Sequence, residues 1–579
     1  MITTALRTTL RAAFTAMTAA RVAHLGLGPL NRQGRLFKIL EMLAYMHLAF
    51  LALVKRKFSY VAIGLAVIHP ISVDGSEMTL LHRFLCLLVL GKKGTNLPPV
   101  VYTDVLVRAF LTNGLWKRHL LEKEAVKYMG DTWCIIRPFN SDSWALATPV
   151  VFVSNPDVVR EVLQDKESYP TRGHTGFSSL TKNGLLGLPT NETWTTHRRV
   201  VSKFLSDGYL KKFSEDIQGQ CDVLLDKWED AQKKSKVVNA YYDMSMLTLD
   251  IIMRVGTGTT GPDANNQSLD EKDNDLAHGL DYALQEIVMR TLNPLHEYIP
   301  SPNQWYMKEL MNKMFQVFER VFQEAKDKIE TAEANGVEIA PTMLSAMVKA
   351  KNPDGTPALN EEELRDELTT VRGAGHETTS NTLCWCLISL MRNPEKLAKL
   401  REEILEVTAG DNNRSLSYEQ AKKLKYGHQV IYESLRMFPT VPSFPREAMK
   451  ATKIKHYDIP KHALVFVSQT PMNYNAELWP EPDKFIPERF DELPELLMSK
   501  PVGIPGGELY GFVPFGAGAR TCIGQRLAML EALQILGSVV KNFDWKLRNP
   551  QDDATLTGYA DVTLGPKHGL FLDVMKILN

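Results

Sequence analysis

A single cysteine, Cys522, stands in a glycine-rich stretch at residues 515–524, Phe-Gly-Ala-Gly-Ala-Arg-Thr-Cys-Ile-Gly. A cysteine thiolate is a strong donor to iron, and the surrounding glycines permit the unusual backbone angles of a loop that wraps closely around sulfur. A helix is predicted to start at Gln525, directly after this stretch. Its N-terminal N–H groups would point at the sulfur and favour the thiolate over the thiol. The stretch therefore indicates an iron–thiolate centre, and the alternative is a buried structural cysteine in a turn.

This stretch matches a known family signature at every fixed position. Phe515, Gly518, Arg520, Cys522 and Gly524 fit the pattern Phe-x-x-Gly-x-Arg-x-Cys-x-Gly, which is the haem-binding signature of cytochromes P450. The chain resembles this family, and its motif wording is most similar to eukaryotic, membrane-bound, lipid-oxidising members. The resemblance implies a haem b cofactor with Cys522 as the axial thiolate ligand. It also implies that the other four residues bind the cofactor, with Arg520 at a haem propionate.

A second motif, Gly-Ala-Gly-His-Glu-Thr-Thr-Ser at 373–380, lies inside residues 361–390, which contain no proline and are predicted to form one long helix. Ala374 and Thr378 are four residues apart and would share one helical face. The Thr378 hydroxyl could hold a water and deliver protons, and Glu377 could relay protons from solvent. In the family this is the oxygen-activation motif. The resemblance therefore implies that Thr378 and Glu377 are catalytic and that Ala374 faces the haem.

The second motif also departs from family patterns. Ala374 stands where the branch with ester-linked haem often has glutamate, so no such ester is expected. Arg372 occupies a position that is commonly apolar in the family. It lies about 200° around the helix from Ala374, so we predict that it points away from the haem. His376 is predicted to pack or to form hydrogen bonds, not to bind a metal.

Three further positions resemble propionate-binding residues of the family. Trp194 and Arg198 are four apart on a predicted helix, and an indole N–H and a guanidinium on one face suit a carboxylate. A surface arginine beside a core tryptophan is the alternative. Arg446 matches the third position, and residues 441–444 just before it are predicted to border the substrate pocket.

A structural cluster is implied by a third set of residues. Glu433 and Arg436 are three apart on a predicted helix, and Arg489 follows in Pro-Glu-Arg-Phe. An exposed pair of this kind would be worth little. The family instead buries a Glu-Arg-Arg cluster, so removing one member would leave buried charge without a partner.

The composition limits the possible classes of protein. The 579 residues contain 67 Lys+Arg and 67 Asp+Glu, so charge offers no argument for a nucleic-acid partner, and none is expected. The six cysteines form neither a C-x-x-C pair nor a cluster with histidine at zinc spacing, and Cys384 and Cys386 are predicted to pack in the core. This pattern fits a reducing compartment without disulfides.

The elements that must position these motifs are mainly helical. Strand-like runs occur at 132–136, 150–153, 451–470 and 560–575, and helical patterns occupy most of the remainder. We therefore predict a mainly α fold with small β-sheets, an α-rich α+β fold in which a long central helix crosses the haem. The predicted domains are a basic targeting-like segment at 1–35, a membrane-anchoring region and linker at 36–95, and a haem-thiolate catalytic domain at 96–579.

The N-terminal region is predicted to anchor the protein to a membrane. Residues 1–40 contain arginine but no Asp or Glu, as in an organellar transit peptide. The mostly apolar runs at 36–54 and 58–73 flank a basic triplet at 55–57, and neither is a clean span. A buried helical pair is the alternative. The predicted location is the endoplasmic reticulum membrane facing the cytosol, with a mitochondrial or plastid membrane as the alternative.

Together these features predict a haem-dependent monooxygenase that inserts one atom of O₂ into a lipophilic substrate such as a fatty acid, sterol, terpenoid or carotenoid. No dinucleotide-binding glycine motif is found, so electrons must come from a separate donor. An NADPH-cytochrome P450 reductase type of donor is expected, or a ferredoxin if the protein is organellar. The alternatives are a lipid isomerase or dehydratase that does not need O₂, and a non-catalytic haem-binding protein.

Overall fold

The computed structural model describes residues 131–140, 145–173, 181–258, 302–491 and 510–577, the last without 557, 561 and 567, and a few isolated positions outside these ranges. The chain divides into two compact units, and all described residues belong to the unit made of Leu81–Val101 and Arg108–Asn579. The predicted membrane segments at 36–95 and the basic segment at 1–35 lie outside the described residues. Among the described residues, no helix has the length and apolarity needed to cross a membrane.

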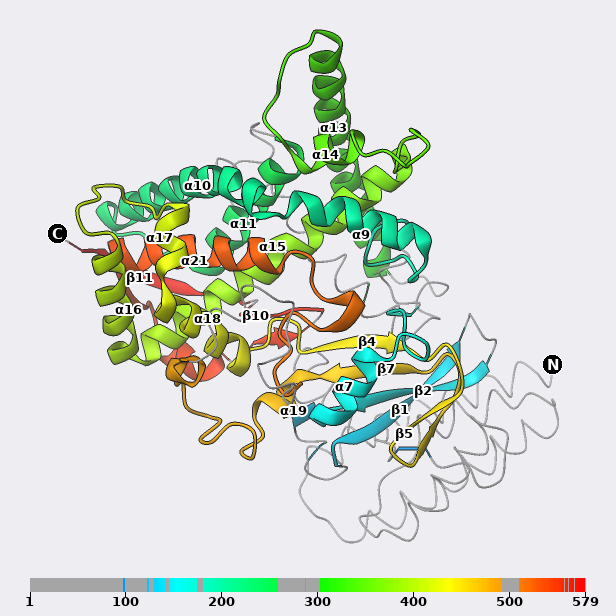
Figure 1. Cartoon of the computed structure of the whole chain (residues 1–579). Coiled ribbons are helices and arrows are strands. Elements are labelled where there is room, and N and C mark those ends of the chain that lie inside the picture. Colours follow the sequence, from blue (N-terminus) through cyan, green and yellow to red (C-terminus); the bar gives the residue numbers. More distant parts are fainter. Residues whose placement is uncertain are drawn as a thin grey trace, which may run out of the picture. The chain divides into compact units, whose positions relative to one another are not determined.

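Helices make up most of the described chain, as predicted (Figure 1). The α-helices are α7 (Pro156–Gln164), α9 (Glu192–Phe204), α10 (Asp207–Lys233), α11 (Ala240–Thr257), α13 (Pro302–Ala334), α14 (Met343–Val348), α15 (Glu361–Arg392), α16 (Pro394–Val407), α17 (Tyr418–Lys423), α18 (Lys425–Met437), α19 (Gln469–Asn473) and α21 (Gln525–Asn542). Short 3₁₀ turns are η5 (Pro487–Phe490), η6 (Gly518–Arg520) and η7 (Pro550–Thr555).

The strands form small separate sheets, and each predicted strand region contains strands. The largest sheet has the order β1-β2-β7-β4, and the others are β3-β11-β8, β9-β10 and β5-β6. The strands are β1 (Thr132–Asn140), β2 (Ala145–Val153), β3 (Val238–Asn239), β4 (Ser443–Glu447), β5 (Thr452–Ile454), β6 (Tyr457–Ile459), β7 (Leu464–Ser468), β8 (Phe543–Leu547), β9 (Tyr559–Ala560), β10 (Leu564–Gly565) and β11 (Phe571–Lys576).

The largest sheet holds one edge of the site. β2 pairs in parallel with β7, and β4 pairs with β7 antiparallel. The aromatic ring of Phe152 on β2 stacks on Trp133 of β1 and on Phe466 of β7, at centroid distances of 4.2 and 5.4 Å. Cross-strand aromatic pairs of this kind help to set the register of a sheet. The register places Arg446 of β4 opposite Val465 of β7.

The long helix α15 forms the centre of the helical part, and its start is encoded locally. The Asn360 side chain accepts a hydrogen bond from the backbone N–H of Glu363, and the Glu363 side chain accepts one from the backbone N–H of Asn360. This capping box satisfies helix N–H groups that would otherwise lack partners. α15 packs against α11, α18 and α21. From Thr379 to Leu390 every residue is buried, so this half of the helix lies inside the core.

Candidate haem-thiolate site

The Cys522 loop has the tight geometry that its glycines suggest. The backbone N–H of Cys522 donates to the carbonyl oxygen of Phe515 at 2.8 Å, which closes the loop just before α21 begins at Gln525. Gly518 has a φ of +70°, and a Cβ there would lie 2.2 Å from the carbonyl oxygen of Leu163 at the end of α7. Any side chain at Gly518 would therefore push the loop away from α7.

The Cys522 side chain is open to a cavity but surrounded by protein, whereas the other described cysteines are buried. It is also the only one of them that lines the mostly apolar cavity beside α15. Desolvation raises the pKa of the Cys522 thiol above its ordinary value. The N–H groups of Gly524 and Gln525 and the charges of Arg172 and Arg198 oppose this rise. The sulfur therefore lies among donors and cations that favour a thiolate.

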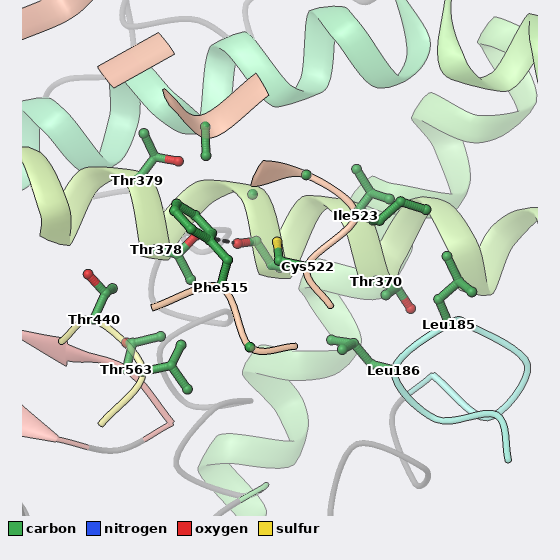
Figure 2. A pocket seen from close by; sticks show the side chains of 18 of the residues that line it. Leu185, Leu186, Thr370, Thr378, Thr379, Thr440, Phe515, Cys522, Ile523 and Thr563 are labelled. Atoms are coloured by element: carbon green, nitrogen blue, oxygen red, sulfur yellow. Dashed lines mark hydrogen bonds between the residues drawn. The ribbon is translucent and has the colours of Figure 1, made fainter. Parts of the chain in front are cut away.

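The cavity that Cys522 faces has a volume of about 370 Å³ and mostly apolar walls. Figure 2 shows Cys522 and Phe515 on their loop beside the ribbon of α15, which carries Thr370 and Thr378. The walls include residues of α9 (Trp194, Arg198), of α15 (Ala374, Thr378), and of β4 and the chain just before it (Phe444, Val441). Residues 441, 443 and 444 therefore border the cavity as predicted.

Four arginines gather at one part of this cavity: Arg172, Arg198, Arg446 and Arg520. None of them forms an ion pair with a carboxylate of the described chain. Arg198 donates to the carbonyl oxygen of Thr521 at 2.9 Å, and Arg172 donates to that of Arg520 at 3.2 Å. Both contacts fix the backbone beside Cys522.

Burial and mutual repulsion lower the pKa values of these guanidinium groups. Desolvation, with the charges of the other arginines, lowers the pKa of Arg520 to about 8 and that of Arg446 to about 9. Buried like charges without counterions are costly. A cofactor with two carboxylates, placed between Cys522 and α15, would supply the missing negative charge. The residues present therefore fit haem, whose propionates these arginines would hold.

The Arg520 side chain also holds two segments of the chain together. Its Nη1 and Nη2 donate to the carbonyl oxygens of Leu185 and Leu188 at 3.0 and 2.7 Å, and its Nε donates to the Thr190 hydroxyl at 2.8 Å. Its guanidinium also lies 4.3 Å from the ring centroid of Trp194. Because these bonds use three of its five N–H groups, Arg520 mainly ties the Cys522 loop to residues 185–190.

The second motif lies on α15 as predicted, but its residues differ in their surroundings. The Thr378 hydroxyl lines the cavity and donates to the carbonyl oxygen of Ala374 at 2.7 Å. Glu377 is buried and lies outside the cavity walls. His376 Nε2 lies 2.7 Å from the Ser245 hydroxyl of α11, so His376 forms the hydrogen bond that was predicted. A Cβ at Gly375 would lie 2.9 Å from Ile252, so close packing of α11 explains this glycine.

Arg372 points away from this cavity, as its position on the helix predicts. It is 1% exposed and lines a different cavity between α13 and α15. Its guanidinium lies 4.6 Å from the ring centroid of Phe318 on α13.

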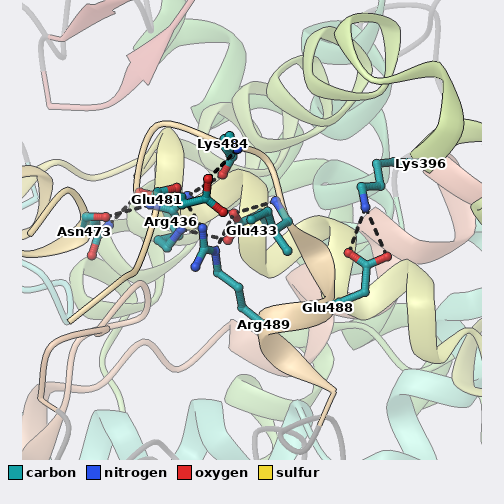
Figure 3. A network of polar contacts seen from close by, with 9 residues as sticks. Lys396, Glu433, Arg436, Asn473, Glu481, Lys484, Glu488 and Arg489 are labelled. Atoms are coloured by element: carbon teal, nitrogen blue, oxygen red, sulfur yellow. Dashed lines mark hydrogen bonds and ion pairs between the residues drawn. The ribbon is translucent and has the colours of Figure 1, made fainter. Parts of the chain in front are cut away.

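The structure brings the Glu-Arg-Arg cluster together in the core beside the site (Figure 3). Arg436 binds both carboxylate oxygens of Glu433 at 2.8 Å, and Arg489 Nε donates to Glu433 Oε1 at 3.3 Å. Glu433 and Arg436 are fully buried. Arg436 also donates to the carbonyl oxygens of Asn473 and Lys484 at 2.7 and 3.1 Å. The cluster therefore fastens α18 to α19 and to the chain leading into η5.

Arg172 is a residue of this site that the sequence patterns do not predict. It stands alone in Pro-Thr-Arg-Gly, with no motif or periodicity to set it apart from other arginines. The bridge between Thr171 and Glu447, the last residue of β4, and the hydrogen bond from Arg172 to the carbonyl oxygen of Arg520 place it next to the Cys522 loop.

Comparisons with known proteins agree with this site. The model for the cytochrome P450 family matches residues 141–572. Cytochrome P450 72A68 of Medicago truncatula is 25% identical over 441 residues, which cover 75% of this chain and 80% of that protein. Cytochrome P450 734A1 of Arabidopsis thaliana is 27% identical, with 75% and 80% covered. Cytochrome P450 4V2 of Mus musculus is 26% identical, with 67% and 73% covered.

These relatives come from plants and animals at similar identities, so the comparisons single out no branch of the family. The family match covers both the Cys522 loop and α15. The chain therefore belongs to the cytochrome P450 family, whose members are monooxygenases that bind haem through a cysteine thiolate.

Proposed function

We propose that this monooxygenase oxidises a lipophilic substrate of the fatty acid, sterol, terpenoid or carotenoid class. The mostly apolar cavity between α15 and the Cys522 loop is the observation that carries this proposal. Apolar walls with a few polar groups favour a ligand that is itself mainly hydrocarbon. Phe444, Leu185 and Leu186 contribute such walls, while Thr370, Thr378 and Thr440 add hydroxyl groups.

In this proposal Cys522, the four arginines and the loop glycines hold the haem, and bound haem supplies the activation of O₂. Thr378 holds a water at the cavity wall and passes protons toward the reacting oxygen. Its hydroxyl donates to the Ala374 carbonyl and keeps acceptor capacity for that water. Glu377, one residue before it, resupplies those protons.

Thr378→Ala should retain haem and the thiolate spectrum but lose most product. We expect product per NADPH to fall roughly a hundredfold while NADPH consumption continues, because the proton carrier is lost and the fold is not. Parallel assays of NADPH oxidation, hydrogen peroxide and product check this expectation. Thr378→Ser keeps a hydroxyl and should restore coupling. If Thr378→Ala stays fully coupled, Thr378 is not the proton carrier.

We further propose a separate electron donor of the NADPH-cytochrome P450 reductase type, with a ferredoxin as the alternative for an organellar protein. Arg199, Lys203, Lys211 and Lys212 are exposed on α9 and α10. Arg199 and Lys203 share α9 with Arg198, which contacts the backbone beside Cys522, and this group of exposed cations suits an acidic donor. The proposed location is a membrane, that of the endoplasmic reticulum facing the cytosol, or a mitochondrial or plastid membrane if residues 1–35 are a transit peptide.

The substrate proposal is tested by adding a lipid panel to the purified holoprotein and recording haem spin-state shifts. Compounds that shift the spectrum are then incubated with NADPH, a diflavin reductase and isotopically labelled O₂. We expect at least one lipid class to bind and to gain one labelled oxygen only when the reductant is present. Conversion without reductant would instead support an isomerase or dehydratase, and no conversion of any bound lipid would support a haem-binding protein.

A further inference from the structure

Arg372 is a buried cation that the monooxygenase site does not use. Its side chain is 1% exposed, and its Nε and Nη2 have no hydrogen-bond partner. The group lines a cavity of about 460 Å³ between α13 and α15. The rings of Phe318 and Phe315 also line this cavity, and Phe315 lines the Cys522 cavity as well.

The other charged groups of this cavity already have partners. Arg365 forms ion pairs with Glu319, at 2.8 Å, and with Glu361. Asp366 accepts a hydrogen bond from the backbone N–H of Asn183 at 2.8 Å. Among the charged residues described around the cavity, the guanidinium of Arg372 is therefore left for a ligand.

A buried guanidinium without an anion is unfavourable. Desolvation lowers the pKa of Arg372 to about 9, so the group still carries its charge at neutral pH. The ring of Phe318 offsets only part of the lost hydration. Charged side chains in a protein core normally have a hydrogen-bonding partner of opposite charge. The buried guanidinium of Arg372 therefore points to an anion that enters the cavity.

The two cavities adjoin. Phe315 of α13 and Thr369 of α15 line both the Arg372 cavity and the Cys522 cavity. Thr369 lies one helical turn before Arg372, so a ligand that extends from the apolar cavity to the guanidinium would run past Phe315 and Thr369.

We infer that Arg372 binds the carboxylate of an amphiphilic substrate whose hydrocarbon body lies in the Cys522 cavity. A guanidinium presents a planar pair of N–H groups that matches a carboxylate. The aromatic rings of α13 suit the methylene groups next to it. This inference rests on the proposed function and narrows its substrate class to carboxylic acids.

The test uses the haem-loaded protein, with dodecanoic acid and methyl dodecanoate as probes. Spin-state titrations at constant pH should give a lower Kd for the acid than for the ester in the wild type. In Arg372→Met the Kd for the acid should rise roughly tenfold to a hundredfold, because charge-assisted hydrogen bonds are lost. The Kd for the ester should change by less than about threefold, and Arg372→Lys should recover part of the acid affinity.

Asn312→Ala is the matched control, because Asn312 lines the same cavity but carries no charge. It should leave the ratio of acid to ester affinity unchanged. The melting temperature of ligand-free Arg372→Met gives a second readout. It should equal or exceed that of the wild type, because a buried unpaired charge is removed.

Three results would overturn the inference. The first is an unchanged ratio of acid to ester affinity in Arg372→Met, and the second is a large fall in the melting temperature of that variant. The third is that acetate stabilises the wild type but not Arg372→Met, while the wild type shows no preference for dodecanoic acid over its ester. The last would identify a site for free anions instead of substrate. In each case a spin shift with the ester would leave the broader lipophile proposal standing, so the two failures can be told apart.

Discussion

Cys522→Ala should abolish oxygenation and remove the long-wavelength absorption band of a thiolate-bound ferrous haem–carbon monoxide complex. The other described cysteines are buried and do not line the cavity, so none of them can supply a thiolate in place of Cys522. Without a thiolate donor, bound haem loses the electron density that favours O–O cleavage. Product formation should fall to the background of free haem. Carbon monoxide difference spectra and product assays on the same preparation measure both effects.

Cys386→Ala is the matched control for this variant. Cys386 is fully buried on α15, and burial raises the pKa of its thiol to about 12, so it remains a neutral packing group. We expect a loss of stability of about 1 kcal/mol, with the thiolate spectrum intact. A Cys522→Ala protein that keeps the thiolate band, or that still oxygenates substrate, would show that Cys522 is not the thiolate ligand.

Glu433→Gln should be among the most destabilising single substitutions in the core. It leaves Arg436 fully buried without its counterion and weakens the contact with Arg489. Removing one partner of a buried pair costs about 3–5 kcal/mol. Because α18 and the chain before η5 are both fastened by Glu433, much of the protein should also fail to retain haem. Denaturant unfolding and the ratio of haem to protein test this expectation.

Glu488→Gln provides the comparison from the same part of the chain (Figure 3). Glu488 lies one residue before Arg489 and pairs with Lys396 and Lys399 at 3.1 and 3.0 Å, in a partly exposed setting. Ion pairs of this kind contribute about 0–1 kcal/mol. Equal losses of stability in the two variants would contradict a special role for the buried cluster.

The parts of this protein that could be predicted from sequence are those encoded over short distances. The Cys522 loop requires glycines at set positions around one sulfur, and α15 requires a cap and a long run without proline. Ala374 and Thr378, or Glu433 and Arg436, meet because a helix brings residues three or four apart to one face. Strand regions followed from apolar β-branched runs. Each of these depends on neighbours within one element, so the amino-acid order alone is sufficient.

The tertiary structure decided the features that depend on distant segments. Arg172 stands beside the Cys522 loop because the chain following α7 runs next to β4. Arg520 donates to the carbonyl oxygens of Leu185 and Leu188, which are far away in sequence. These bonds occupy N–H groups that the motif alone would assign to haem. The helix period places Arg372 on the side of α15 away from Ala374, but only α13 makes that side a cavity. Charges acquire their partners, or lack them, when separate elements pack together, and no local pattern records that outcome.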